Sequence, residues 1–187
     1  MKTEELNIWK NKYRDISEEI YIRPIEEADV DKWVEWRNSD TVKNYYIYRG
    51  TFTRESQLEW MKANINTGRA VLMIICLSDN DRAIGCVHIK DIDRVHNKGE
   101  YGIFIGEKDA QGKGYGNDAA KMMLRYGFED LKLHRIYLEA IEGNEPAIKS
   151  YENAGFVKEG LLKDDAFIDG SYKNIVWMAA INPREDI

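Results

Sequence analysis

Hydrophobic and polar positions along the chain follow two periods, and their order predicts the elements of the fold. Two apolar runs of strand length, separated by a polar turn cluster, predict a hairpin over residues 70–89. Apolar residues that recur at steps of three and four predict a helix that includes residues 120–131. Other strands are predicted over 20–25, 100–105, 135–141 and 175–181, and other helices over 26–37, 53–65 and 145–153.

This order of elements predicts an α/β domain with a mixed sheet. Residues from 156 onward read as strands, with Asp169 and Gly170 at a hairpin turn. Thr53 and the residues after it resemble a helix start without a full capping box. Residues 1–19 can form a short helix. A chain of 187 residues favours one domain and can bury a core without disulfides or a metal.

Composition and charge limit which binding partners and which cellular compartment we expect. The chain has 27 basic and 33 acidic residues, a formal net charge of −6, which disfavours binding to a nucleic-acid backbone. Cys76 and Cys86 are too few for a disulfide scaffold or a zinc site, and we expect buried free thiols. No secretory signal and no apolar run of about 20 residues is apparent, which predicts a cytoplasmic protein without a membrane segment.

A glycine-rich segment, Gln111–Gly116, connects the strand at 100–105 to the next helix. Glycine allows close backbone approach, and a helix start offers unpaired N–H groups, so the segment predicts a cradle for a phosphate or pyrophosphate. A Walker loop is excluded, because five residues separate Gly106 from Gly112 and no hydroxyl follows Lys113. The spacing also differs from the dinucleotide fingerprint. A flexible glycine-rich turn is the alternative that these residues leave open.

A second motif opens the helix over residues 145–153. Asn144 is a suitable N-cap, and Pro146 is compatible with a first turn. Tyr151 follows Asn144 by seven residues, about two helical turns along one face. Gly155 is placed to end the helix in a left-handed conformation.

Together, Q-x-x-G-x-G from Gln111 and N-x-x-A-x-x-x-Y-x-x-x-G-F from Asn144 resemble the GNAT superfamily of acetyl-CoA-dependent N-acetyltransferases. The resemblance covers residues 20–182 as one domain and leaves residues 1–19 as an extension. It implies a mostly antiparallel central sheet with two parallel strands that splay apart, flanked by helices. Residues 91–102 and 166–178 most resemble bacterial spermidine and ribosomal-protein N-terminal acetyltransferases. Residues 36–38, followed by 55–60, also resemble enzymes that acetylate nucleotide-linked amino sugars.

The resemblance also implies a binding site for acetyl-CoA. Backbone groups of one loop would hold the pyrophosphate: Gln111, Gly112, Lys113, Gly114, Tyr115 and Gly116. The strand at Ile103, Phe104 and Ile105 would pair with the pantetheine arm, and Asn144 and Ala147 would hold it from the other side. The fold requires no metal. The three histidines, His88, His96 and His134, show no ligand spacing and read as surface or core residues.

The reaction implied is direct attack of a primary amine on the thioester in a ternary complex. Tyr151, at the family's tyrosine position, would protonate the departing thiolate, and either Glu100 or Glu139 would take the amine proton. A polyamine, an amino sugar and a protein N-terminus are all open as acceptors. The rival hypothesis is a non-catalytic CoA-binding sensor or assembly module. A homodimer is compatible with the resemblance.

The acceptor pocket implied by the family lies between the first two helices, their connecting loop and the final hairpin. Its aromatic candidates are Trp33, Trp36, Tyr45, Tyr46, Tyr48 and Phe167, of which Trp33 and Trp36 are expected in the core. Acidic residues nearby, Asp91, Asp93, Asp164 and Asp165, favour a cationic amine. Arg37 and Arg49 would instead favour a nucleotide-linked acceptor.

Overall fold

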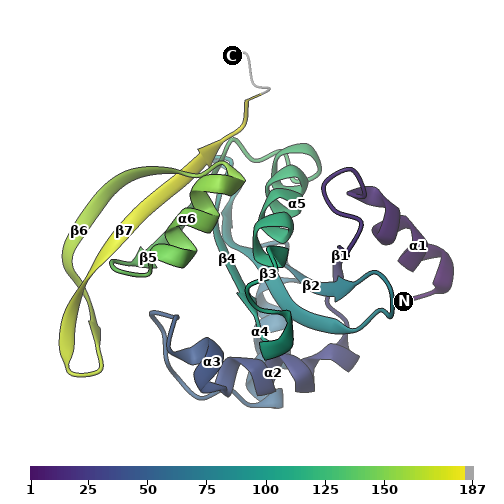
Figure 1. Ribbon diagram of the computed structural model, residues 1–187, viewed down its shortest axis with the longest axis horizontal. Helices are drawn as coiled ribbons and strands as arrows, with labels where there is room; N and C mark the ends of the chain where they lie inside the picture. The colour runs from purple at the N-terminus through teal and green to yellow at the C-terminus, as the bar shows by residue number, and fades with distance from the viewer. Residues whose placement is uncertain (184–187) are drawn as a thin grey trace.

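The fold is centred on a sheet of seven strands with helices on both faces, and the computed structural model describes residues 1–183 (Figure 1). In sheet order, the strands are β1 (Ile20–Pro24), β2 (Val71–Leu77), β3 (Ala83–Asp93), β4 (Lys98–Ile105), β5 (Arg135–Ile141), β7 (Ser171–Ile181) and β6 (Val157–Ile168). The helices are α1 (Thr3–Lys12), α2 (Val30–Asn38), α3 (Asp40–Lys43), α4 (Arg54–Asn64), α5 (Tyr115–Glu129) and α6 (Glu145–Ala154). Two short 3-10 turns, Glu27–Asp29 and Lys108–Ala110, precede α2 and α5.

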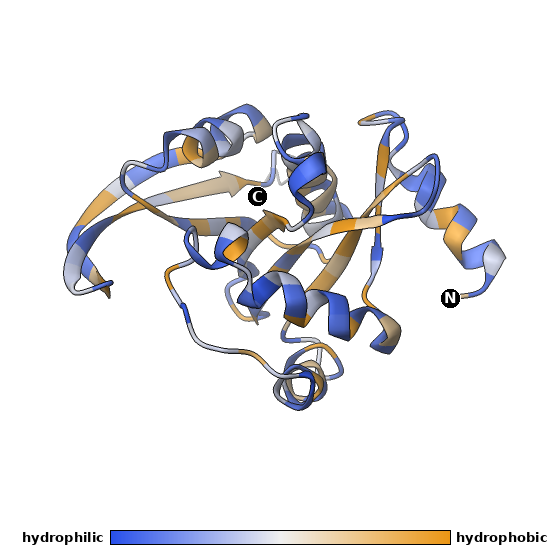
Figure 2. Cartoon of the chain, turned by 60° about the horizontal axis from the view of Figure 1, so that its bottom comes forward, coloured by the Kyte–Doolittle hydropathy of each residue, from blue (hydrophilic) through white to orange (hydrophobic). Residues whose placement is uncertain are grey.

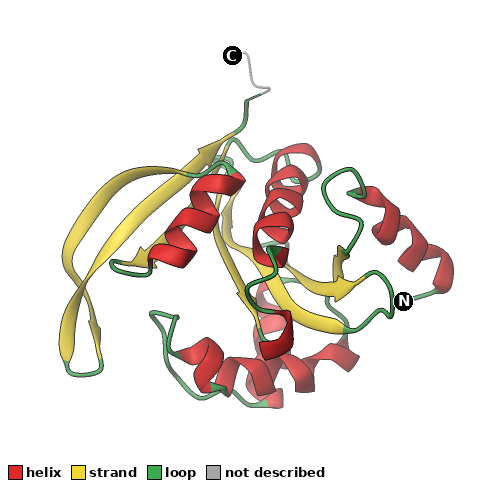
Figure 3. Ribbon diagram, in the orientation of Figure 1, coloured by secondary structure: helices red, strands yellow, loops and turns green. Residues whose placement is uncertain are grey.

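The sheet is mixed, as the sequence predicted. Every neighbouring pair of strands is antiparallel except β4 and β5, which run parallel. These two strands pair only over Lys98–Glu100 and Arg135–Tyr137. Beyond that point they diverge, and residues 101–105 of β4 have no partner on β5. The predicted fold, a mostly antiparallel sheet with splayed parallel strands flanked by helices, is therefore confirmed (Figure 3).

Apolar side chains of β2 fill two cores, one on each face of the sheet. Met73 and Ile75 belong to the core under α5 and α6, whereas Ile74 and Cys76 belong to the core with Trp33 of α2. Alternate residues of a strand point to opposite faces, so a strand covered on both sides needs an unbroken apolar run. Figure 2 shows this concentration of hydrophobic residues along the central strands.

Several boundaries differ from the sequence prediction. Residues 40–43 form the short helix α3 where a loop was expected, and β7 begins at Ser171 rather than at residue 175. Strand β3 continues to Asp93, past a break in its pairing with β4 where Asp91 has a φ of 50°. Such irregularities change the strand's direction without ending it, so a regular period-two pattern does not reveal them.

The start of α4 corrects the expectation of an incomplete capping box. The Thr53 hydroxyl accepts from the Ser56 backbone N–H at 3.2 Å, and the Ser56 hydroxyl accepts from the Thr53 backbone N–H at 3.0 Å. Serine thus takes the place that glutamate or glutamine holds in the usual box. The reciprocal bonds fix the helix that forms one wall of the cavity described next.

Candidate active site

A large cavity lies where β4 and β5 diverge and continues to α2 and α4. Its volume is about 860 Å³, within the range of small-molecule sites. At one end its wall comes from β4, β5 and α6, with Ile103, Ile105, Leu138, Asn144, Ala147 and Tyr151. At the other end it comes from α2, α4 and the connecting loop, with Trp33, Arg37, Tyr45, Tyr46, Phe52 and Trp60. Segments far apart in the sequence thus share one space.

The glycine loop leads into α5 at the edge of this cavity. Gly112 and Gly114 have φ values of +71° and +87°, a left-handed backbone that favours glycine. A Cβ added at Gly112, Gly114 or Gly116 would meet nothing within 4 Å, so space for a ligand lies directly above the backbone. Gln111 and Gly116 line the cavity, and the predicted residues 112–115 lie in the segment between them without lining it.

Two features suit this loop to an anion. The first N–H groups of α5 have no intrahelical acceptor and lie at the positive end of the helix dipole. The Gln111 side-chain amide donates to the Ile105 carbonyl at 2.8 Å, which ties the loop to the end of β4. The loop and the splayed strand are therefore held together as one surface that fits a diphosphate followed by an extended arm.

The splayed end of β4 keeps free main-chain groups on its β5 side. Ile103, Phe104 and Ile105 all line the cavity, as predicted for the arm-binding strand. The Phe104 ring is largely buried and packs edge-on against Trp36 and Tyr46, with ring centroids 6.1 and 6.0 Å apart. These contacts anchor β4 on its other face and leave its edge open.

Helix α6 presents the second motif to the same space. Asn144, Ala147 and Tyr151 line the cavity, and the Asn144 side chain makes no capping bond to the helix it precedes. The Tyr151 ring packs edge-on against Tyr101 and Phe156, with ring centroids 6.0 and 6.1 Å apart. Burial raises the pKa of Tyr151 to about 12, so its hydroxyl is protonated throughout the neutral range.

Both predicted carboxylates reach the cavity, in different surroundings. Glu100 forms an ion pair with Lys90 at 3.0 Å. Glu139 has no ion pair within residues 1–183, and burial, together with the negative charges of Glu100 and Asp165, raises its pKa. A carboxylate with a raised pKa is the better proton acceptor near neutral pH.

The acceptor end has aromatic walls, with some changes to the predicted set. Trp33 is buried, as expected, and its ring meets that of Trp60 edge-on at 5.8 Å. Trp36 is also buried, but its indole N–H donates to Glu107 at 2.9 Å outside the cavity. Phe167 is 66% exposed and does not line the cavity.

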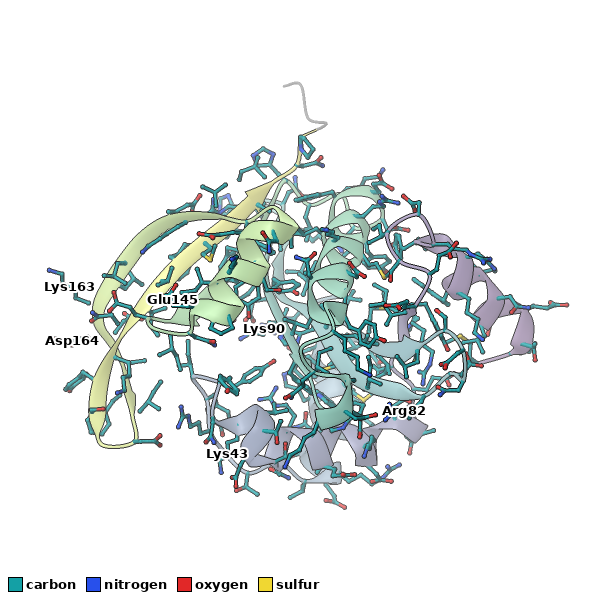
Figure 4. All side chains as sticks on the ribbon, in the orientation of Figure 1. Lys43, Arg82, Lys90, Glu145, Lys163 and Asp164 are labelled. Carbon is teal, nitrogen blue, oxygen red and sulfur yellow. The ribbon has the colours of Figure 1, made fainter. Side chains whose placement is uncertain are left out.

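The acidic residues named as acceptor neighbours lie outside the cavity lining. They are Asp91, Asp93, Asp164 and Asp165. Figure 4 shows Asp164 on the outer side of the β6–β7 hairpin, beside Lys163 and away from Lys90. The negative charge of Asp165 contributes to the raised pKa of Glu139. The negative charge of the cavity wall itself therefore comes from Glu100 and Glu139.

His88 is a cavity residue that the sequence did not single out. It lies buried on β3 opposite Gly102 of β4, where a Cβ would come within 2.5 Å of its ring. Burial and the positive charges of Arg37 and Lys90 lower its pKa to about 3, so the imidazole is neutral. The pairing of His with Gly across two strands was the available signal, but it requires the register, which the sequence does not give.

Among the described residues, no group of three or more His, Cys, Asp and Glu side chains could hold a metal ion. Cys76 and Cys86 are free and buried, as predicted. No helix in residues 1–183 combines the length and the apolar character that a membrane crossing needs.

Splayed parallel strands beside a glycine-rich helix start define an acetyl-CoA-dependent N-acetyltransferase. The sequence matches the acetyltransferase (GNAT) domain over residues 19–157, and the chain belongs to this family. Enzymes of the family use acetyl-CoA as cosubstrate, so the predicted class is confirmed and the sensor alternative is not favoured.

The relatives that the chain matches include spermidine acetyltransferases. The chain is 32% identical over 161 residues to spermidine N(1)-acetyltransferase of Escherichia coli (strain K12), covering 85% of this chain and 84% of the relative. It is 27% identical over 169 residues to the Vibrio cholerae enzyme, covering 90% and 96%. A crystal structure of spermidine N-acetyltransferase from Vibrio cholerae in complex with CoA and spermine superposes with a TM-score of 0.83 at 26% identity, covering 89% of this chain and 97% of that chain.

Proposed function

We propose that this enzyme acetylates a primary amine of an acceptor whose remainder lies against the aromatic end of the cavity, and that polyamines such as spermidine are within its acceptor range. The observation that carries the proposal is the continuity of the cavity from the glycine loop, past Glu139 and Tyr151, to the aromatic walls. Polyamines are included because the relatives are spermidine acetyltransferases and because aromatic walls attract ammonium groups.

The loop and the splayed strands fit the cosubstrate. Backbone N–H groups of residues 111–116 would bind the pyrophosphate, and the free edge of β4 would pair with the pantetheine arm. Asn144, with its uncommitted amide, and Ala147 would contact the arm from α6. Bound acetyl-CoA supplies an activated thioester carbonyl.

Glu139 is proposed as the base in preference to Glu100. A primary amine has a pKa of about 10 and is mostly protonated at neutral pH, so a proton must leave before attack. Glu139 lacks an ion-pair partner and has a raised pKa, whereas Lys90 neutralises Glu100 at 3.0 Å. Glu139, directly or through a water, takes the proton from the amine.

Tyr151 is proposed as the acid. As the nitrogen–carbon bond forms and the carbon–sulfur bond breaks, the Tyr151 hydroxyl donates its proton to the departing sulfur and regains one from solvent. The ammonium form of the amine loses two protons in all, one before attack and one as the amide forms. One of them balances the proton gained by the thiol, and the other is released to solvent. A main-chain N–H of the splayed part of β4 would donate to the oxyanion.

Release of free thiol from acetyl-CoA tests the proposal, with spermidine, amino sugars and N-terminal peptides as acceptors. Tyr151→Phe is expected to lower kcat by a factor of about 10 to 10⁴, because it removes the proton donor, while CoA affinity stays nearly unchanged. Tyr172→Phe, at an exposed tyrosine of the hairpin, is the matched control. Normal turnover by Tyr151→Phe would exclude the hydroxyl from the mechanism.

Two further aspects stay predictions. A dodecameric structure is described for the Vibrio cholerae relative, and for this chain a homodimer remains our expectation. A cytoplasmic location also remains an expectation from the sequence.

A further inference from the structure

We propose that Arg37 forms an anion-binding subsite at the aromatic end of the cavity, so that the preferred acceptor carries a carboxylate or phosphate as well as its amine. This inference rests on the proposed function and specifies its acceptor. It predicts that such an amine is a better substrate than a polyamine.

Arg37 is a cation in the cavity wall without a carboxylate partner. Its guanidinium lies 4.6 Å from the ring centroid of Tyr46 and 4.2 Å from that of Phe52. Within residues 1–183 it forms no ion pair. The other cation that lines the cavity, Lys90, is neutralised by Glu100 at 3.0 Å. Burying a guanidinium without a partner of opposite charge costs free energy, and a bound anion would offset this cost.

The residues around Arg37 hold it in place. The neighbouring Asn38 makes two hydrogen bonds to the backbone of Phe52, donating to its carbonyl at 2.8 Å and accepting from its N–H at 2.9 Å. Arg49 donates to the backbone carbonyls of Asn44 and Tyr46 at 2.7 and 3.2 Å. These bonds fix the backbone at Tyr46 and Phe52, whose rings contact the guanidinium of Arg37. A guanidinium donates a planar set of N–H groups that suits a carboxylate or phosphate.

The cavity wall carries negative charge on β4 and β5 and positive charge on α2. Its only described lining carboxylates, Glu100 and Glu139, lie on β4 and β5, and Arg37 lies on α2. Beside Arg37 the imidazole of His88 is neutral, and the buried Tyr46 hydroxyl has no hydrogen-bond partner within the described chain. An acceptor with an amine at Glu139 and an anion at Arg37 matches both ends. A polyamine would bring a second ammonium toward the guanidinium.

Acceptors of equal length but different distal charge test this inference. Pentylamine, cadaverine and δ-aminovalerate differ only in a neutral, cationic or anionic end, and glucosamine and its phosphate ester separate phosphate from carboxylate recognition. We expect kcat/KM for the anionic member of each set to exceed that of its neutral counterpart by about ten-fold or more, as for a charged hydrogen-bonding group.

Removal of the guanidinium distinguishes recognition from a structural role. Arg37→Gln is expected to lower kcat/KM for δ-aminovalerate by about ten-fold to a hundred-fold while changing that for pentylamine by less than about three-fold. Arg37→Lys keeps the charge but not the planar fork, and an intermediate loss is expected. Arg54→Gln, at a partly exposed arginine that pairs with Glu27 and Asp31 outside the cavity, is the control.

Equal losses for the neutral and anionic amines in Arg37→Gln and Arg37→Lys would overturn the inference, as would equal turnover of all wild-type pairs. If no amine is acetylated, the proposed function fails, and the subsite is then tested by binding. Calorimetry of δ-aminovalerate with the CoA complex should show binding that weakens by about ten-fold or more in Arg37→Gln, whereas pentylamine should bind both proteins alike. Equal affinity of δ-aminovalerate for the wild type and Arg37→Gln would contradict the subsite.

Discussion

At the scale of single residues, Glu139 and Glu100 show how neighbours separate two carboxylates of the same type. They lie on the two strands that diverge, and both face the cavity. Only Glu100 has a lysine beside it. Sequence spacing placed both residues in the site but could not rank them, because Lys90 becomes the partner of Glu100 only through the register of β3 and β4.

Glu139→Gln should lower kcat by about a hundred-fold, since an amide cannot accept the amine proton. Glu100→Gln is the matched control, with a loss below about ten-fold. A base acts only when deprotonated, so wild-type activity should fall as pH drops through the raised pKa of Glu139, whose charged neighbours are Glu100, Asp165 and Lys90. The Gln variant should lack this fall in its pH profile. A larger loss in Glu100→Gln would reverse the assignment.

At the scale of elements, we propose that the loop between β4 and α5 binds the pyrophosphate of the cosubstrate. Gly114→Val is expected to abolish CoA binding, because the added side chain occupies the open space above the backbone. Calorimetry with CoA is the measurement. Gly68→Val places the same residue at another exposed glycine of positive φ, +73°, and controls for backbone strain. Gly116→Ala, at a glycine without positive φ, should weaken binding without that strain. Normal CoA affinity in both loop variants would contradict the assignment.

Most of these elements could be predicted from periodicity and turn residues. The continuous apolar run of β2 and the helical spacing in α5 are strong signals because burial on defined faces requires them. The short helix α3 and the extension of β3 past Asp91 were missed, because they depend on tertiary packing and on a break in the ladder. The sequence also did not predict that His88 lines the cavity or that Arg37 forms no ion pair within residues 1–183, because both depend on tertiary packing.

At the scale of the molecule, the cavity joins the two halves of the chain. Its aromatic end is built mainly from residues 33–60, and the opposite end, where we propose that the cosubstrate binds, mainly from residues 100–151. The motifs predicted the elements of the second half, because a glycine-rich loop and a helix N-terminus can be recognised from residues adjacent in the sequence. The first half offered only aromatic residues, whose positions in the core or in the cavity wall are decided by packing.

The first nineteen residues also join the body of the protein. The Trp9 ring packs at 6.1 Å from Tyr126 of α5, the Tyr13 side chain is buried, and Lys12 pairs with Asp130. We therefore propose that α1 is an integral part of the domain surface. The family match begins at residue 19, so this helix is an addition to the shared core.

A crystal structure with CoA tests the central claim, that the splayed strands and the glycine loop hold the cosubstrate for attack by an amine. We expect the diphosphate on the backbone N–H groups of residues 111–116, the pantetheine arm along residues 103–105, and the sulfur within hydrogen-bonding reach of Tyr151. An ordered CoA bound elsewhere, with the loop and the edge of β4 free, would contradict it.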